Sequence, residues 1–207
     1  IDDPDTLDYY RNLAKESVFG KSDIIVNSNT SNLKFGDIKV VKTKINKKIY
    51  TSVSVPIRGG AYSLLSSLVL VYSNDQLVTY IETLFTNNNN KFKIDTYTGG
   101  KLLESKSTNI DYTNDAEIQK GLDELHKIAN NNVCTKFTTP GVGKIATCIA
   151  SVLGVNAGVA YLIAGTCATS CPTVPPICAA CIAGVCAMGA GDVKACLLYT
   201  SDAADER

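Results

Sequence analysis

The residues whose chemistry is most distinctive in this chain are its cysteines. All eight follow residue 133, and the chain contains a single histidine, His126. Many cysteines in a short segment with almost no histidine are typical of a disulfide framework, and hence of an oxidising compartment. The disulfide candidates are Cys134, Cys148, Cys167, Cys171, Cys178, Cys181 and Cys186.

The segment around these cysteines is strongly apolar. Residues 145–191 form a run of 47 positions without a charged side chain. Residues 144–168 and 177–190 are rich in aliphatic side chains and predict helices, whereas Pro172, Pro175 and Pro176 must interrupt a helix. The pattern predicts a C-terminal all-α, disulfide-stapled apolar helical hairpin that turns near Val174.

The cysteine spacings suit such a hairpin, because residues three or four apart lie on one face of a helix. Cys167 and Cys171 are four apart, and Cys178 and Cys181 are three apart. One hypothesis is that Cys171 pairs with Cys178 and Cys167 with Cys181. Thioether crosslinks in place of disulfides stay open.

Two other interpretations of the segment are a zinc site and a membrane span. Four thiolates at these spacings could bind zinc, but these cysteines lie among alanine, isoleucine and valine, so we predict no metal. A membrane span needs about 20 apolar residues. Residues 145–165 nearly meet that length, with Asn156 inside, and a knot that inserts only at a target membrane is a further alternative.

Residues 196–207 match the translation of a sequencing-library adapter, so we expect them to be an artefact. The chain starts at Ile1, and we expect its N-terminus to be cut as well. Without the tail, 20 basic and 20 acidic residues become 19 and 17, since Arg207 and three acids leave. The excess lies after residue 131, which suits contact with anionic membranes rather than nucleic acid. Seven cysteines remain, an odd number that predicts a free thiol or a missing partner.

The front of the chain reads as an α+β domain. A helix is predicted over Asp5–Ser17, capped by Asp5 or Thr6 and ended by Gly20. Between Ile24 and Tyr112, alternating apolar residues predict five or six strands in an antiparallel meander. The clearest strands are residues 38–45, 49–55, 64–72, 78–85, 92–97 and 101–110, with turns at 46–48, 74–75, 87–90 and 99–100.

This front domain has no arrangement of residues typical of catalysis, so we predict no enzyme and no cofactor. Arg58, before two glycines, could bind an anion, but a turn is the better interpretation. Its tyrosines could stack on a ligand, but half-buried sheet positions are the better interpretation. These tyrosines are Tyr50, Tyr62, Tyr72, Tyr80 and Tyr97. His126 reads as a surface residue.

A second flanking helix is predicted over Asn114–Asn130, where Asn114 and Glu117 can form a capping box. The polar run Asn130, Asn131 and Asn132 ends it and is a plausible processing region, because proteases cut such loops. We therefore expect a leader or carrier domain over 1–131, a cysteine-rich domain over 132–195, and an artefact over 196–207.

The cysteine-rich segment resembles a known family. Residues 164–171, Ala-Gly-Thr-Cys-Ala-Thr-Ser-Cys, and residues 177–186, Ile-Cys-Ala-Ala-Cys-Ile-Ala-Gly-Val-Cys, resemble the halocin C8-like bacteriocin domain. The resemblance covers residues 132–195. It implies an antimicrobial peptide made as the C-terminal part of a precursor, exported, and released by cleavage. It also implies that the N-terminal part can act as the immunity partner.

Together these features predict the precursor of a secreted antimicrobial peptide, or bacteriocin. The cystine-rich peptide would be released by proteolysis and act on a target-cell membrane or a membrane receptor, so its partners include export machinery and a processing protease. The alternative is a membrane-anchored or cell-surface interaction protein with an exposed β domain.

Overall fold

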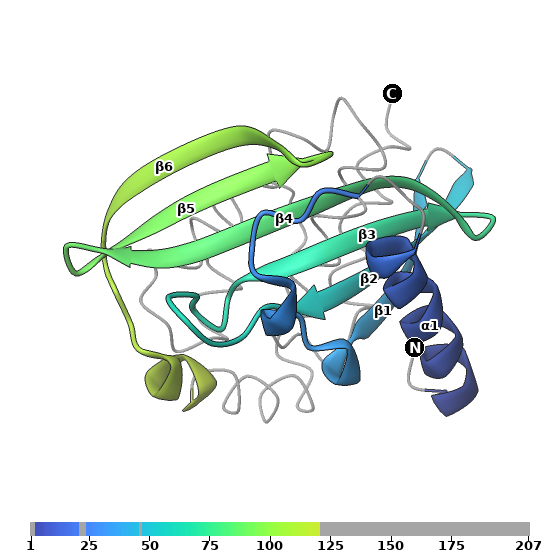
Figure 1. Cartoon of the computed structure of the whole chain (residues 1–207), viewed down its shortest axis with the longest axis horizontal. Coiled ribbons are helices and arrows are strands. Elements are labelled where there is room, and N and C mark those ends of the chain that lie inside the picture. The colour runs from blue at the N-terminus through green and yellow to red at the C-terminus, as the bar shows by residue number, and fades with distance from the viewer. Residues whose placement is uncertain (1–2, 21–23, 46, 121–207) are drawn as a thin grey trace, which may run out of the picture.

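A computed structural model describes residues 3–20, 24–45 and 47–120, which form one antiparallel β-sheet with few helices (Figure 1). The six strands lie side by side in chain order, β1-β2-β3-β4-β5-β6. Residues 115–120 begin a further helix. The elements are α1 (Pro4–Phe19), η1 (Thr30–Asn32), η2 (Phe35–Asp37), β1 (Lys39–Ile45), β2 (Lys48–Pro56), β3 (Ser67–Ser73), β4 (Gln76–Asn88), β5 (Lys91–Thr98) and β6 (Lys101–Asp111).

The predicted α+β fold class is wrong for this part of the chain. One α-helix and two short 3-10 helices accompany a sheet that takes up most of residues 39–111. Strands β2, β4, β5 and β6 are longer than their apolar alternation suggested, because polar positions continue the pairing, as at the ends of β4 and β6. The predicted all-α hairpin and the domain boundary at 131 lie outside the described residues.

The turns explain why the strands follow one another so directly. Two-residue hairpin turns need a positive φ at both central positions, which asparagine, aspartate and glycine tolerate best. Such turns join β3 to β4, β4 to β5 and β5 to β6. Their residues are Asn74 and Asp75, Asn89 and Asn90, and Gly99 and Gly100, all with positive φ. The expected loop 87–90 is therefore shorter, since β4 extends through Asn88.

The connection between β2 and β3 is the exception. A strand was expected from Leu64, but β3 begins at Ser67. Ser66 donates its backbone N–H to Ser63, and its hydroxyl lies 2.9 Å from the backbone nitrogen of Phe85. These bonds hold residues 57–66 as a loop against the neighbouring strand β4.

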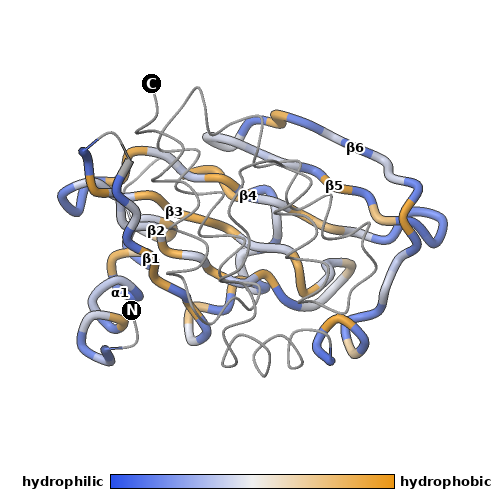
Figure 2. Tube along the Cα trace, turned by 180° about the vertical axis from the view of Figure 1, so that it is seen from behind, coloured by the Kyte–Doolittle hydropathy of each residue, from blue (hydrophilic) through white to orange (hydrophobic). Residues whose placement is uncertain are grey.

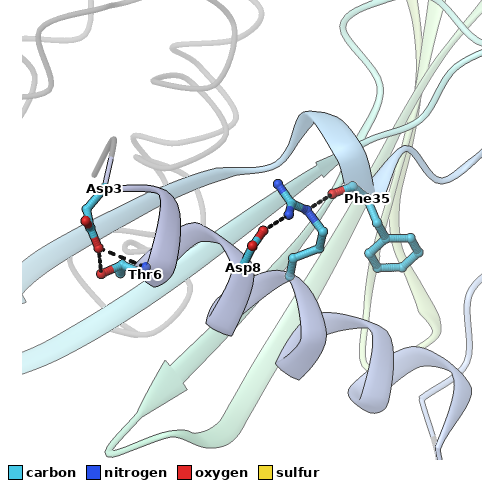
Figure 3. A network of polar contacts seen from close by, with 5 residues as sticks. Asp3, Thr6, Asp8 and Phe35 are labelled. Atoms are coloured by element: carbon cyan, nitrogen blue, oxygen red, sulfur yellow. Dashed lines mark hydrogen bonds and ion pairs between the residues drawn. The ribbon is translucent and has the colours of Figure 1, made fainter.

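Helix α1 begins at Pro4, one residue before the predicted start at Asp5. Asp3, rather than Asp5 or Thr6, is the N-cap, and its carboxylate accepts the Thr6 backbone N–H at 2.9 Å (Figure 3). Pro4 follows, which suits the first helical position because that N–H needs no partner. Further along, the Arg11 guanidinium bonds Asp8 and donates to the Phe35 carbonyl at 3.0 Å, which joins α1 to η2.

The main apolar core lies between α1 and one face of the sheet, which we call the first face. Tyr10 and Ala14 of α1 are buried there, and α1 ends at Gly20 as expected. The Ser17 and Tyr72 hydroxyls share a hydrogen bond of 2.9 Å. The buried cluster comprises Tyr10, Ala14, Leu33, Phe35, Ile38, Val40, Val53, Val55, Ile57, Leu68, Leu70, Tyr72, Tyr80 and Leu84.

Residues 24–28 cross the first face and are held there by polar contacts with β4. The buried carboxylate of Glu82 accepts the backbone N–H groups of Asn27 and Ser28 at 2.8 and 2.9 Å. The Tyr80 hydroxyl accepts the N–H of Ile25 at 3.0 Å. Because Tyr80 and Glu82 are two apart in one strand, they point to the same face, and both hold the crossing segment.

Candidate functional site

The opposite side of the sheet, which we call the second face, is the feature with the clearest potential for binding. Directly paired residues of antiparallel strands lie on the same face. Ser54 pairs with Val69, Val69 with Ile81, and Ile81 with Thr98, which traces this face across four strands. Its central members are Val41, Thr43, Tyr50, Ser52, Ser54, Val69, Val71, Ile81, Phe85, Phe92, Ile94 and Thr98, and the same pairings add the less buried Lys39, Lys48, Pro56, Ser67, Thr79, Thr83, Asn87 and Thr96.

The second face is buried, although α1, η1 and η2 all lie on the first face (Figure 1). Val71, Ser52 and Ser54 are 0% exposed. None of the second-face residues belongs to the buried cluster that contains α1. Figure 2 is turned by 180°, so the sheet is seen from this side. The burial of the second face is therefore not explained by α1, η1 or η2.

The centre of the second face is also uncharged, as none of these twelve residues is acidic or basic. The nearest charged side chains on this side lie at the sheet edges. Lys39 pairs with Ser54 from β1, and Glu104 and Lys106 come from β6. At the start of β2, the Lys48 Nζ lies 5.5 Å from the centroid of the Tyr50 ring. All four charged residues are exposed. A surface of this kind binds apolar groups by burial, and it holds no titratable side chain at its centre for acid–base chemistry.

Small hydroxyl side chains interrupt the apolar residues of the second face. Within the part of the chain that the structure describes, four buried hydroxyl oxygens lack a hydrogen-bond partner. Three of them, on Thr43, Ser54 and Thr98, belong to this face, and the fourth is on Ser28. Leaving such a group unpaired costs about 1–3 kcal/mol. These hydroxyls are therefore available to polar groups of whatever covers the face.

The chain leaves the sheet at one end of the second face. Tyr112 donates its N–H to the Asn90 carbonyl at 2.9 Å, and its ring centroid lies 4.8 Å from that of Phe92. Phe92 in turn contacts Phe85, with ring centroids 6.4 Å apart. Burial is the main cause that raises the pKa of Tyr112. These three rings extend the second face toward residues 113–120.

The helix that starts at Asp115 is anchored beside this aromatic group. Asn114 caps it as predicted, because its side chain accepts the Glu117 N–H at 3.0 Å. The Asp115 carboxylate accepts the N–H of Leu64 at 2.9 Å, and Ile118 is 0% exposed. The last described residues are thus fixed to loop 57–66 before the chain continues.

Arg58 organises that loop and is not free to bind an anion with its Nη1. This nitrogen donates to the carbonyls of Ile57 at 3.0 Å and Leu64 at 2.9 Å, with a longer contact to Ser66 at 3.4 Å. Burial lowers the pKa of Arg58, and the carboxylates of Asp115 and Asp37 oppose that change. The turn interpretation of Arg58-Gly59-Gly60 therefore agrees with the structure, where both glycines have positive φ.

The tyrosines of interest occupy sheet and loop positions and do not form one ligand platform. Tyr72 and Tyr80 are buried on the first face, and Tyr50 on the second. Tyr62 and Tyr97 are half-buried against the first-face core. His126, the disulfide candidates and the processing region Asn130–Asn132 lie outside the described residues.

Sequence reasoning missed two features of this domain, Glu82 and the second face. A single glutamate in an alternating strand does not indicate that its carboxylate will accept hydrogen bonds from backbone N–H groups far away in the sequence. The second face did leave a signal, because Leu68-Val69-Leu70-Val71 is apolar at consecutive positions. Such a run is typical of a strand buried on both sides, and only one side was assigned a cover.

Residues 3–20, 24–45 and 47–120 contain no group of three or more His, Cys, Asp or Glu side chains that could hold a metal ion. In the same ranges, no helix has both the length and the apolar character needed to cross a membrane. Comparison of the chain with protein families, curated proteins and solved structures gave no match. The resemblance to the halocin C8-like domain stays a prediction.

Proposed function

We propose that this chain is the precursor of a secreted antimicrobial peptide. Residues 132 onward supply the cystine-rich peptide, which proteolysis near Asn130–Asn132 releases and which acts on the membrane of a target cell or on a receptor there. The preceding residues are its leader or carrier, and a candidate immunity partner. No catalytic step is needed for this role.

The observation that supports this proposal is the separation of two kinds of sequence along the chain. The β-sheet domain is built without any cysteine, and all eight cysteines follow residue 133. The 47-residue uncharged run lies entirely within that second part. A β-sheet region without cysteine followed by a cysteine-rich, apolar segment suits a carrier that precedes its cargo.

The direct test is killing by the released peptide. The cystine-rich part from the complete gene would be oxidatively folded and spotted on lawns of related strains, beside the same peptide after reduction and alkylation. We expect clear zones with the oxidised form alone, because a small peptide of this kind needs crosslinks to hold its shape. Lawns that grow through the oxidised peptide would contradict the proposal.

Cell fractionation separates the proposal from the alternative of a cell-surface protein held by an apolar segment. A precursor yields a small peptide in the culture medium, detectable by mass spectrometry. An anchored protein stays with the membrane fraction at its full mass. The second outcome would replace the proposed function by the surface-protein interpretation.

A further inference from the structure

We infer that the second face of the sheet is the docking surface for this chain's own uncharged segment, residues 145–191. This inference rests on the proposed function, because the docking is a contact between carrier and cargo only if the chain is such a precursor. The surface of the carrier is the second face, and the part of the cargo that contacts it is the segment 145–191. Four independent features of the described residues support it.

The first feature is burial without a described cover. Central residues such as Val71 and Ser54 are 0% exposed, yet α1, η1 and η2 lie on the other side of the sheet. An antiparallel sheet often leaves one face in water, and that face then carries polar and charged side chains. The buried centre of the second face carries no charged side chain, so it is suited to being covered.

The second feature is the match in charge. The twelve central residues of the second face include no acidic or basic side chain, and neither does the segment 145–191. A charged partner would lose its hydration on this surface without finding a counter-charge. Residues 1–131 contain no uncharged run of similar length, which singles out 145–191 as the occupant.

The third feature is the path of the chain. Tyr112 packs on Phe92 of the second face, and the Asp115 carboxylate fixes the next helix to Leu64. Between Lys120 and Ile145 lie 24 residues, which can span up to roughly 80 Å when extended. Strand β4 has 13 residues, or roughly 43 Å. The segment can therefore reach any part of the face.

The fourth feature is the set of unpaired hydroxyls. Thr43, Ser54 and Thr98 each place a buried oxygen on this face without a hydrogen-bond partner among the described contacts. Buried polar groups are normally paired. The segment 145–191 can supply partners through its own threonines, serines and backbone carbonyls.

Photo-crosslinking in the full chain tests the contact directly. Tyr50→p-benzoylphenylalanine places a photoreactive ring on the second face, where Tyr50 is 6% exposed. Tyr9→p-benzoylphenylalanine is the matched control, because Tyr9 is 49% exposed on α1. After irradiation and digestion, mass spectrometry identifies the crosslinked peptide. We expect a peptide from 145–191 at a several-fold higher yield from position 50 than from position 9.

Each other outcome overturns the inference. Crosslinks confined to residues 1–120, equal yields at the two positions, or a crosslinked dimer would show that something else covers the face. If Tyr50→p-benzoylphenylalanine loses the circular dichroism of the sheet, Phe85→p-benzoylphenylalanine repeats the test at the other end of the face. The killing assay is a separate test. Crosslinking to 145–191 without killing would support the docking and contradict the proposed function. Killing without crosslinking would support the proposed function and contradict the docking.

Discussion

The hydroxyls of Ser17 and Tyr72 lie 2.9 Å apart and share a hydrogen bond that joins α1 to the central strand β3. Tyr72 is 1% exposed. Burial raises the pKa of Tyr72 from 10.0 to about 12, and the bond to Ser17 opposes this only in part. Within the described residues, α1 is the only α-helix that is complete. The bond from Ser17 therefore joins this helix to Tyr72, a side chain that loses its proton only in strongly alkaline solution.

The first prediction concerns stability at high pH. Between pH 10 and 12 the folded chain keeps the Tyr72 proton, while the unfolded chain has lost it, so rising pH favours unfolding. The shift corresponds to about 2–3 kcal/mol of stability that is present below pH 10 and lost as pH passes 12. Urea unfolding of the full chain at pH 9, 10, 11 and 12 measures this loss.

Tyr72→Phe is the matched variant for this measurement, because phenylalanine has no proton to lose. We expect its free energy of unfolding to fall less between pH 10 and 12 than that of the unchanged chain. Parallel curves for the two proteins would mean that Tyr72 is not the buried titrating group.

The second prediction concerns Glu82, whose carboxylate accepts the N–H groups of Asn27 and Ser28. Glu82→Gln leaves one carbonyl oxygen to accept, so one buried N–H loses its partner. We expect a loss of about 1–3 kcal/mol in the free energy of unfolding. Glu104→Gln on the exposed strand β6 should stay within about 0.5 kcal/mol. Hydrogen exchange at Asn27 and Ser28 that does not change in Glu82→Gln would contradict this role.

The third prediction compares two neighbouring glycines in the turn between β5 and β6. Gly99 and Gly100 both have positive φ, but a Cβ at Gly100 would lie 2.5 Å from the Cβ of Ile25, whereas one at Gly99 meets nothing within 4 Å. Gly99→Ala should cost about 1–2 kcal/mol from backbone strain alone. Gly100→Ala should cost clearly more.

Ile25→Ala cannot remove this clash fully, because Ile25 Cβ and carbonyl oxygen both lie within 3.3 Å of the added atom. Gly100→Ala should therefore stay more destabilising than Gly99→Ala in the Ile25→Ala background, as thermal unfolding can show. Equal losses for the two glycine variants would mean that residues 24–28 do not pass this close to the turn.

The fourth prediction concerns Arg58, whose Nη1 donates to the carbonyls of loop 57–66. Lysine lacks the planar fork of donors, so Arg58→Lys should lower the free energy of unfolding by about 1–3 kcal/mol. Arg11→Lys alters a single bond to a backbone carbonyl, that of Phe35, and an ion pair with the exposed Asp8, so it should cost less than about 1 kcal/mol. If the two arginine variants unfold at the same urea concentration, Arg58 does not organise the loop.

The sequence was most informative where a residue's own backbone preference decides the structure. Asn74-Asp75 and Gly99-Gly100 were recognised as turns because few other residues adopt positive φ. The cap at Asn114 was recognised for a similar local reason. Strand ends and the first helix cap were less accurate, because Asp3 and Asn88 take their roles from neighbours that a local pattern does not contain.

The candidate site was beyond the reach of local patterns. Membership of the second face depends on the register of six strands, so Ser54 and Thr98 meet on one side only after four pairings are known. Glu82 is similar, as its partners lie more than 50 residues earlier in the chain. The predicted α+β fold class is wrong for the described residues, because one sheet takes up most of residues 39–111 and few helices accompany it.

The measurement that tests the central claim most directly is killing before and after cleavage of the same folded chain. A protease site inserted at Asn130–Asn132 in the complete gene product allows the cut to be made after oxidation. We expect the intact chain to leave lawns of related strains unharmed and the separated cystine-rich peptide to clear them. Equal activity before and after the cut, or no killing by the separated peptide, would contradict the account.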